Sequence, residues 1–283
     1  MNDRELLRFH AIPPKKSLGQ NFLHDPNALE KIVEIADLPP GAEVLEIGPG
    51  TGNLTRVLAQ HAARVVAVET DDRLLPILRA TFAATPAVEL VHADILTLDL
   101  ATVFEDRPFY VVANLPYYIT SAILRRLLET RPRPERIVIT LQREVADRLV
   151  AAPGDLSILG VSVQFYGRPE VAMRLNPAAF WPRPDVESAV VRIDVYRDPP
   201  VDVPDEKTFF RVVRAGFSQK RKQLRNALGS GLGVGKAAAD ELLGRAGIET
   251  HRRAETLSLE EWAALARALV EKSPPSPGPL PPK

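Results

Sequence analysis

The sequence has no cysteine, few histidines and no long apolar run. Without cysteine the chain forms no disulfide and no thiolate metal site, and it has no cysteine nucleophile. Its five histidines lie scattered without the spacing of metal ligands, so we expect no metal centre. No apolar stretch approaches the length of about 18 residues that crosses a membrane. No basic-then-apolar signal pattern opens the chain, so we expect a cytoplasmic protein.

Charge of one sign is not in excess either. Lys plus Arg number 36 and Asp plus Glu also number 36, so the net charge does not indicate a polyanionic partner. Hydrophobic residues make up 45% and charged residues 25%, which is typical of a globular protein. A chain of 283 residues is long enough for one large and one small domain.

Apolar, β-branched runs alternate with segments of helical length over the first two thirds of the chain. This alternation predicts a doubly wound, Rossmann-like α/β fold with a seven-stranded sheet, whose last two strands form an antiparallel edge. The expected strands are Glu43–Ile47, Arg64–Glu69, Val88–His92, Phe109–Asn114, Arg136–Leu141, Val161–Tyr166 and Ser188–Tyr196. The expected helices between them are Pro26–Asp37, Asp71–Ala84, Thr120–Thr130 and Arg143–Val150.

The proline-rich stretch Asp198–Pro204 predicts a stiff linker, followed by a purely helical pattern. Helices are expected at 206–216, 219–228, 235–246 and 258–271, with Ser218 and Ser258 as helix N-caps. The predicted domains are therefore an N-terminal segment 1–25, a Rossmann-like domain 26–198, an all-α domain 205–272 and a disordered proline-rich tail 273–283.

A glycine turn follows the first predicted strand of the sheet, in the order Gly48-Pro49-Gly50-Thr51-Gly52. Gly48 and Gly50 allow unusual backbone angles and the close approach of a ligand. NAD-binding proteins use a similar turn, and a purely structural turn is the other alternative. Glu46 before the turn favours a cofactor that carries positive charge over a pyrophosphate.

Two further carboxylates end neighbouring strands. Glu69 follows Gly48 by 21 residues, the distance at which an acidic residue binds ribose hydroxyls. Asp94 follows the third strand, where it can accept a hydrogen bond from an adenine amino group. The alternative interpretations are an ordinary surface carboxylate for Glu69 and a loop cap for Asp94.

The string Asn114-Leu115-Pro116-Tyr117 ends the fourth strand, next to the cofactor site across the sheet. The side-chain oxygen of Asn114 and the carbonyl of Pro116 can both accept hydrogen bonds from adenine N6, stabilising the charge that develops on this poor nucleophile. Tyr117 offers a flat face on which a base can stack. The two motifs together predict a methyltransferase acting on adenine N6.

A second aromatic residue is expected on the other face of the base. Phe180, in the segment Phe180-Trp181-Pro182-Arg183-Pro184 after a strand, is our candidate. The alternative is that Phe180 is an aromatic residue of the hydrophobic core.

Positive charge is concentrated in the helical region. Between Lys207 and Lys236 there are eight Lys or Arg and no Asp or Glu. We expect RNA phosphates to contact Lys220, Arg221, Lys222 and Arg225, with Arg221 and Arg225 flanking a buried leucine stripe on one helix. The alternative is a solvated charged helix face.

With these residues placed, the chain strongly resembles the KsgA-type ribosomal RNA adenine N6,N6-dimethyltransferases. The resemblance runs from Pro14 to about Leu269. Besides the two motifs above, it is carried by the segments Lys15–Asp25, Gln142–Ala146, Phe180–Ser188 and Phe217–Asn226. The first of these segments is similar to the part of the family that covers the cofactor.

The resemblance implies S-adenosylmethionine contacts at Asn21, Leu23, Gly48, Glu69, Asp94 and Asn114. It also implies the substrate, two adjacent adenosines in the 3′-terminal hairpin of 16S ribosomal RNA in the small ribosomal subunit, each methylated twice. We expect a monomer that needs no metal and contacts no membrane. The alternatives are another adenine-N6 methyltransferase, acting on large-subunit rRNA or DNA, and a ribosome assembly factor without catalytic activity.

Overall fold

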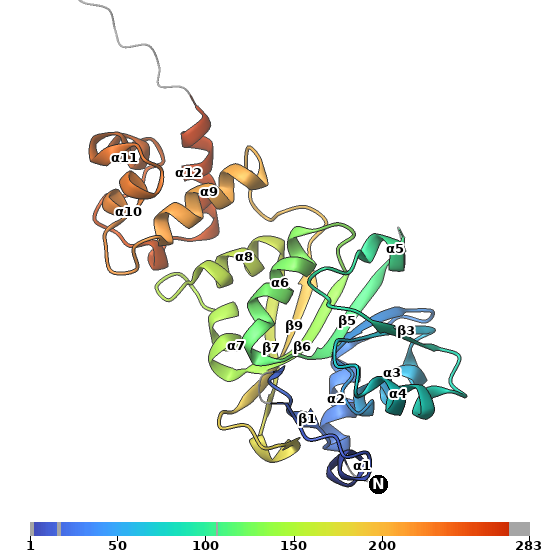
Figure 1. Ribbon diagram of the computed structural model, residues 1–283. Coiled ribbons are helices and arrows are strands. Elements are labelled where there is room, and N and C mark those ends of the chain that lie inside the picture. Colours follow the sequence, from blue (N-terminus) through green and yellow to red (C-terminus); the bar gives the residue numbers. More distant parts are fainter. Residues whose placement is uncertain (1–2, 16–17, 106, 272–283) are drawn as a thin grey trace, which may run out of the picture. The chain divides into compact units, whose positions relative to one another are not determined.

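A computed structural model describes residues 3–15, 18–105 and 107–271 of the chain (Figure 1). The predicted disordered tail lies outside these residues, as do Lys16 and Ser17 of the N-terminal motif. The chain divides into two compact units, and each is described by itself. The first contains residues 1–150 and 166–198, and the second contains residues 151–165 and 199–283.

The first unit is built on a seven-stranded sheet with the strand order β4-β3-β2-β5-β6-β9-β7. The first five strands in this order are parallel, whereas β9 runs antiparallel to both β6 and β7. The strands are β2 (Glu43–Ile47), β3 (Arg64–Glu69), β4 (Val88–His92), β5 (Phe109–Asn114), β6 (Arg136–Gln142), β7 (Gly167–Leu175) and β9 (Ser188–Val195). The predicted α/β fold with an antiparallel edge is confirmed.

One predicted strand is wrong. Residues 161–166 belong to the helix α8 (Ile158–Tyr166), and the seventh strand is β7, which follows it directly. Val161, Val163 and Phe165 are buried and alternate with half-buried Ser162 and Gln164, so the run has the period of two that is typical of a strand although its backbone is helical. Residues 151–165 group with the second unit, where the Phe165 ring stacks on Phe209 with 4.4 Å between ring centroids.

The helices of the first unit include counterparts of the four predicted at 26–37, 71–84, 120–130 and 143–150. They are α1 (Asp3–Phe9), α2 (Pro26–Ala36), α3 (Asn53–His61), α4 (Leu75–Phe82), α5 (Leu100–Phe104), α6 (Thr120–Glu129) and α7 (Arg143–Leu149). The apolar sides of α2 and α3 pack with β2, β3, β5 and β6 in one core cluster that includes Ile32, Leu58 and Val112. A two-stranded sheet pairs β1 (Phe22–Leu23) with β8 (Phe180–Trp181).

Four helices after the linker make up most of the second unit: α9 (Glu206–Phe217), α10 (Leu224–Gly231), α11 (Gly235–Arg245) and α12 (Leu259–Val270). Ser258 caps α12 as predicted, in a capping box with Glu261. Ser218 is not an N-cap, because α10 begins at Leu224 and the Ser218 hydroxyl donates to the Ala215 carbonyl of α9. Leu224 and Leu228 are buried as expected.

Candidate active site

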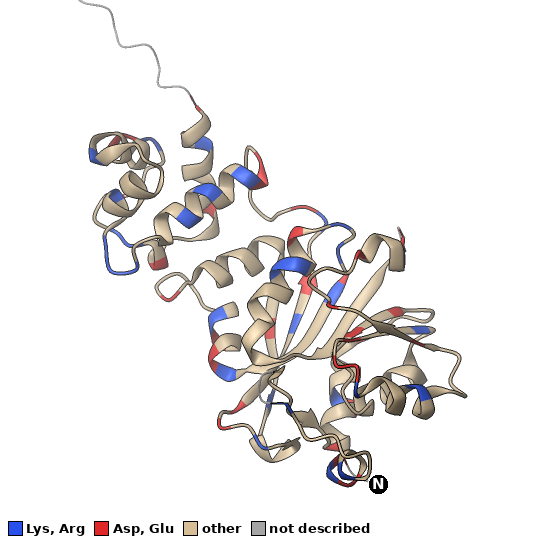
Figure 2. Cartoon of the chain, in the orientation of Figure 1, with Lys and Arg blue, Asp and Glu red and all other residues tan. Residues whose placement is uncertain are grey.

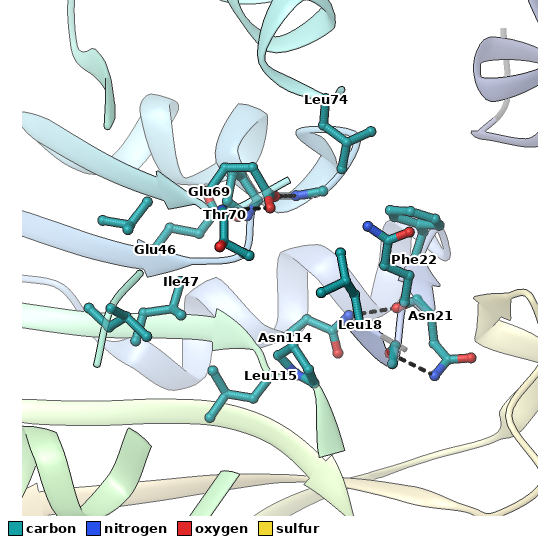
Figure 3. Close-up of a pocket in the computed structure, with 18 of the residues that line it drawn as sticks. Leu18, Asn21, Phe22, Glu46, Ile47, Glu69, Thr70, Leu74, Asn114 and Leu115 are labelled. Carbon is teal, nitrogen blue, oxygen red and sulfur yellow. Dashed lines mark hydrogen bonds between the residues drawn. The ribbon is translucent and has the colours of Figure 1, made fainter. Parts of the chain in front are cut away.

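The carboxyl ends of β2, β3, β4 and β5 open onto one pocket, the position at which doubly wound sheets bind ligands. About 990 Å³ of space free of protein atoms, part of it open to solvent, lies inside the pocket. Glu46, Glu69 and Thr70 lie on one side of it and Asn114 and Leu115 on the other (Figure 3). The pocket therefore brings the glycine turn and the Asn114–Tyr117 motif together.

The glycine turn has the backbone geometry that only glycine adopts freely. The φ angles of Gly48, Gly50 and Gly52 are +68°, +61° and +86°. At Gly50 a side chain would also meet the Phe22 ring, since a Cβ atom there would lie 2.9 Å from Phe22 Cδ1. The turn therefore lets β1 close over it.

Glu69 is buried at the end of β3 and accepts three backbone hydrogen bonds. Its Oε1 accepts from the N–H groups of Thr70 and Asp71 at 2.9 and 2.8 Å, and its Oε2 accepts from Gly50 N–H at 3.2 Å. Burial raises the pKa of Glu69, and the backbone donors oppose that rise. The side chain is thus fixed against the glycine turn, and Oε2 keeps acceptor capacity on the pocket side.

Glu46 is the most deeply buried acid of the pocket, with only 1% of its surface exposed. Among the described residues, neither its Oε2 nor the nearby Thr55 hydroxyl has a hydrogen-bond partner. Burial raises the pKa of Glu46 from 4.5 to about 8, and the Glu69 charge adds to the rise. A buried carboxyl oxygen without a hydrogen bond is costly unless a ligand completes its contacts.

The ionisable residues that line the pocket are all acids or tyrosines. Glu46, Glu69 and Asp94 contribute three carboxyl groups, and no Lys, Arg or His of the described chain lines it. A pyrophosphate would meet only negative or neutral side chains here, whereas a cation would be attracted. The charge of the lining therefore favours a sulfonium cofactor such as S-adenosylmethionine over a pyrophosphate.

Asp94, the third of these acids, follows the end of β4. Its Oδ1 accepts a hydrogen bond from Leu96 N–H at 2.9 Å, so the residue does cap its loop. It also lines the pocket, so the loop cap and a ligand contact are compatible.

Asn114 is held in one orientation by the segment that precedes β1. Its Nδ2 donates to the Asn21 carbonyl at 2.9 Å, as the dashed line in Figure 3 shows. With the amide nitrogen anchored, the Oδ1 atom is left as the acceptor of the side chain. Asn21 and Leu23, two further predicted cofactor contacts, line the same pocket.

The Pro116 carbonyl is not the free acceptor that the sequence predicted. It accepts hydrogen bonds from Ile119 N–H at 3.3 Å and from the Thr120 hydroxyl at 3.2 Å, which occupies both lone pairs. Among the described residues, no hydrogen bond reaches the Leu115 carbonyl, one residue earlier in the same turn. The Leu115 carbonyl is therefore an unoccupied backbone acceptor in the residue next to Asn114.

Tyr117 lines the pocket with its phenol fixed from behind. Its hydroxyl lies 2.6 Å from the hydroxyl of Ser188, a fully buried residue that begins β9. Burial raises the pKa of Tyr117 above its usual 10, so the phenol stays neutral and the ring keeps one orientation.

Phe180 is the one predicted site residue of the first unit that the structure does not bring into the pocket. Its ring is 3% exposed and packs in the core cluster with Leu23 and Val138, where β8 pairs with β1. Phe180 is therefore an aromatic residue of the hydrophobic core, the alternative given above, because its strand β8 pairs with β1 at Leu23. Tyr118 does line the pocket and is 60% exposed, which makes it the available second aromatic residue.

Asp71 does not line the pocket but supports a residue that does, a role that the sequence analysis missed. It is buried two residues after Glu69 and accepts a hydrogen bond from Gln20 Nε2 at 2.8 Å. Arg73 holds the pKa of Asp71 at about 2, so the carboxylate stays ionised. By binding Gln20, Asp71 holds the segment before β1 at the pocket. Its position just after the end of β3 was the sequence feature that could have indicated this role.

Three of the four predicted RNA-binding residues lie in the turn between α9 and α10, a blue stretch in Figure 2. Lys220, Arg221 and Lys222 are exposed there. Arg225 differs, because its guanidinium pairs with Asp240 of α11. The predicted face shared by Arg221 and Arg225 on one helix is wrong, since Arg221 precedes the start of α10.

Two kinds of site have no counterpart in the part of the chain that the structure describes. No group of three or more His, Asp or Glu residues there could hold a metal ion. No helix within the described residues is both long and apolar enough to span a membrane.

Comparison with known proteins agrees with this geometry. The family described as "Ribosomal RNA adenine dimethylase" matches residues 13–269. A relative from Dehalococcoides mccartyi named "Ribosomal RNA small subunit methyltransferase A" is 44% identical over 95% of this chain and 92% of the relative. A relative of the same name from Geobacillus kaustophilus is 46% identical over 94% of each chain.

Solved structures share the fold. The 23S rRNA methyltransferase ErmE is 30% identical with a TM-score of 0.70, covering 89% of this chain and all of that one. A dimethyladenosine transferase from Plasmodium falciparum has a TM-score of 0.73 at 24% identity, covering 86% of this chain and 95% of that one.

Proposed function

The chain belongs to the ribosomal RNA adenine dimethylase family, and we propose that it dimethylates N6 of two adjacent adenosines in the 3′-terminal hairpin of 16S rRNA. The methyl donor is S-adenosylmethionine, whose sulfonium supplies an electrophilic methyl group when bound. One observation carries the proposal. The pocket that holds the Asn114–Tyr117 motif is lined by acidic side chains and, within the described residues, by no Lys, Arg or His.

The residues that would hold the cofactor surround it from several strand ends. Glu69 offers Oε2 to the ribose diol, and the Gly48 and Gly50 turn allows close approach. Asp94 is placed to accept from the adenine amino group, and Glu46 offers its unpaired oxygen to positive charge. Leu23 and Asn21 cover the pocket from the other side.

The target base would be held by the motif after β5. Asn114 Oδ1 and the Leu115 carbonyl accept from the N6 amino group and stabilise the positive charge that develops on N6 during attack. The Tyr117 ring, fixed through Ser188, gives the base a stacking surface. Attack on the sulfonium methyl group needs an in-line approach, so the site would work mainly by positioning the base and by hydrogen-bond acceptors for N6.

Recognition of the small subunit would use the second unit. The exposed cations Lys220, Arg221 and Lys222 lie on one turn, without an acidic neighbour in the sequence from 207 to 236. Contacts of this kind with RNA phosphates give affinity that falls with rising salt concentration.

Transfer of radiolabelled methyl groups tests the proposal directly. Small ribosomal subunits that lack the modification are the substrate, and large subunits and duplex DNA are the competitors. We expect label in 16S rRNA, recovered as N6,N6-dimethyladenosine. Label in 23S rRNA instead would favour the second candidate, an activity like that named for ErmE, and no label in any nucleic acid would leave the assembly-factor alternative.

A further inference from the structure

The helix α1 lies before the part of the chain that matches the family, yet it contacts the pocket's own residues. Asp3, its first residue, is 5% exposed. Both oxygens of its carboxylate accept from Asn53 Nδ2, each at 3.0 Å. A buried carboxylate paired in this way is tied to its partner more strongly than a neutral group would be.

Asn53 connects α1 to the cofactor side of the molecule. It begins α3 immediately after the last glycine of the turn, and it lines the pocket. The same Nδ2 that binds Asp3 also donates to the Leu23 carbonyl of β1 at 3.1 Å. An amide nitrogen carries two hydrogens, so Asp3 and Leu23 together use its full donor capacity.

A second contact joins α1 to the same strand. Leu7 is 1% exposed and packs in a cluster with Phe22 of β1, Leu74 and Leu78. The Phe22 ring lies against Gly50, and both Phe22 and Leu74 line the pocket. The polar end and the apolar side of α1 therefore hold β1 at two adjacent residues.

We propose that α1 clamps β1 over the cofactor, with Asp3 as a positioning residue that acts through Asn53. Three segments far apart in the sequence meet at the Asn53 amide: α1, β1 and the start of α3. The clamp preorganises β1, so the cost of ordering this strand does not fall on cofactor binding. This inference rests on the proposed cofactor function.

The test compares Asp3→Ala with the full-length parent by calorimetric titration of S-adenosylmethionine. We expect affinity to fall about tenfold, which is the loss of one charge-assisted contact. Asp3→Asn keeps one acceptor and should lose only about threefold. Arg4→Ala, on the exposed side of the same helix, is the matched control and should bind as the parent does.

Two readouts separate positioning from simple stabilisation. Hydrogen exchange of residues 18–23 should speed up in Asp3→Ala, and the KM for the cofactor should rise while the KM for the small subunit stays the same. In an Asn53→Ala background, Asp3→Ala should cause no further loss, because the coupling runs through that amide.

The proposal is overturned if Asp3→Ala lowers the unfolding temperature but keeps the parent affinity. Additive losses in the Asn53→Ala background would also overturn it. If Asp3→Ala does not fold, the proposal is overturned by an Asp3→Asn variant that binds S-adenosylmethionine with the affinity of the parent. Failure of the parent itself to bind S-adenosylmethionine would refute the proposed function instead, so the two failures are distinguishable.

Discussion

Replacing Glu46 by glutamine should remove a pH dependence that the parent shows. In the folded protein burial raises the pKa of Glu46 from 4.5 to about 8, so the native state holds a proton that the unfolded chain releases between these values. The contribution of Glu46 to the free energy of unfolding is therefore fully present below pH 4.5 and is lost as the pH rises to about 8. At 1.36 kcal/mol per pKa unit, this group contributes up to about 5 kcal/mol of that change.

Binding of the cationic cofactor should act on the same proton. Positive charge in the pocket favours the ionised form of Glu46, so S-adenosylmethionine should release up to one proton at pH 7 and bind more tightly as the pH approaches 8. S-adenosylhomocysteine lacks the sulfonium charge and should release less. Glu46→Gln should bind both ligands without this proton release.

Calorimetry in phosphate and in Tris measures the released protons, because the two buffers take up a proton with different heats. The parent should show a buffer-dependent heat with S-adenosylmethionine, and Glu46→Gln should not. The reasoning is refuted if the parent gives equal heats in both buffers. The pKa of Glu69 is also raised, but Glu69 is present in both proteins, so any difference between their pH profiles of unfolding comes from position 46. Equal profiles for the parent and Glu46→Gln would therefore also refute the reasoning.

Three further outcomes are expected. Asn114→Ala should lower the methyl-transfer rate about 10²–10³-fold in single-turnover assays, with little change in affinity for the unmethylated small subunit. Glu69→Gln should weaken S-adenosylmethionine binding about tenfold or more by calorimetry, because its amide would face the Gly50 N–H donor and a neutral group would replace the carboxylate at the ribose. Changing Lys220, Arg221 and Lys222 to Glu should weaken subunit binding and flatten its salt dependence, by roughly 0.7–0.9 in the log–log slope per lost phosphate contact. An unchanged methyl-transfer rate in Asn114→Ala would contradict the first expectation, and an unchanged cofactor affinity in Glu69→Gln the second. An unchanged salt dependence after the three charge reversals would contradict the third.

The sequence predicted those parts of the fold in which local pattern and burial agree. β2, β3 and β5 are buried strands of a parallel sheet and stand out as short apolar runs between turns. The run at 161–166 alternates apolar and polar residues as a strand does, yet it lies in α8, because its apolar residues are covered from several sides of the helix. Composition alone cannot separate these two cases.

The site followed the same rule. Glycines 48 and 50 were predictable, because their positive φ angles are a local property of the turn. The occupied Pro116 carbonyl was not, since it depends on the short 3₁₀ helix Tyr117–Ile119 that the sequence analysis did not predict. The ion pair of Arg225 with Asp240 was not, since it depends on how α10 packs against α11. Phe180 was predicted in the site and lies in the core instead, because its burial depends on pairing with β1 more than 150 residues away.

The bond between Tyr117 and Ser188 has a consequence for synthesis of the chain. The two residues are 71 positions apart, and Ser188 begins the strand that is added to the sheet last in sequence order. A nascent chain that ends before this point already has its glycine turn and Asn114, but nothing holds its Tyr117 hydroxyl. Domains are made from the amino terminus onward. The aromatic surface for the base is therefore fixed only when translation of the Rossmann-like unit is almost complete, and fragments released earlier lack a finished site.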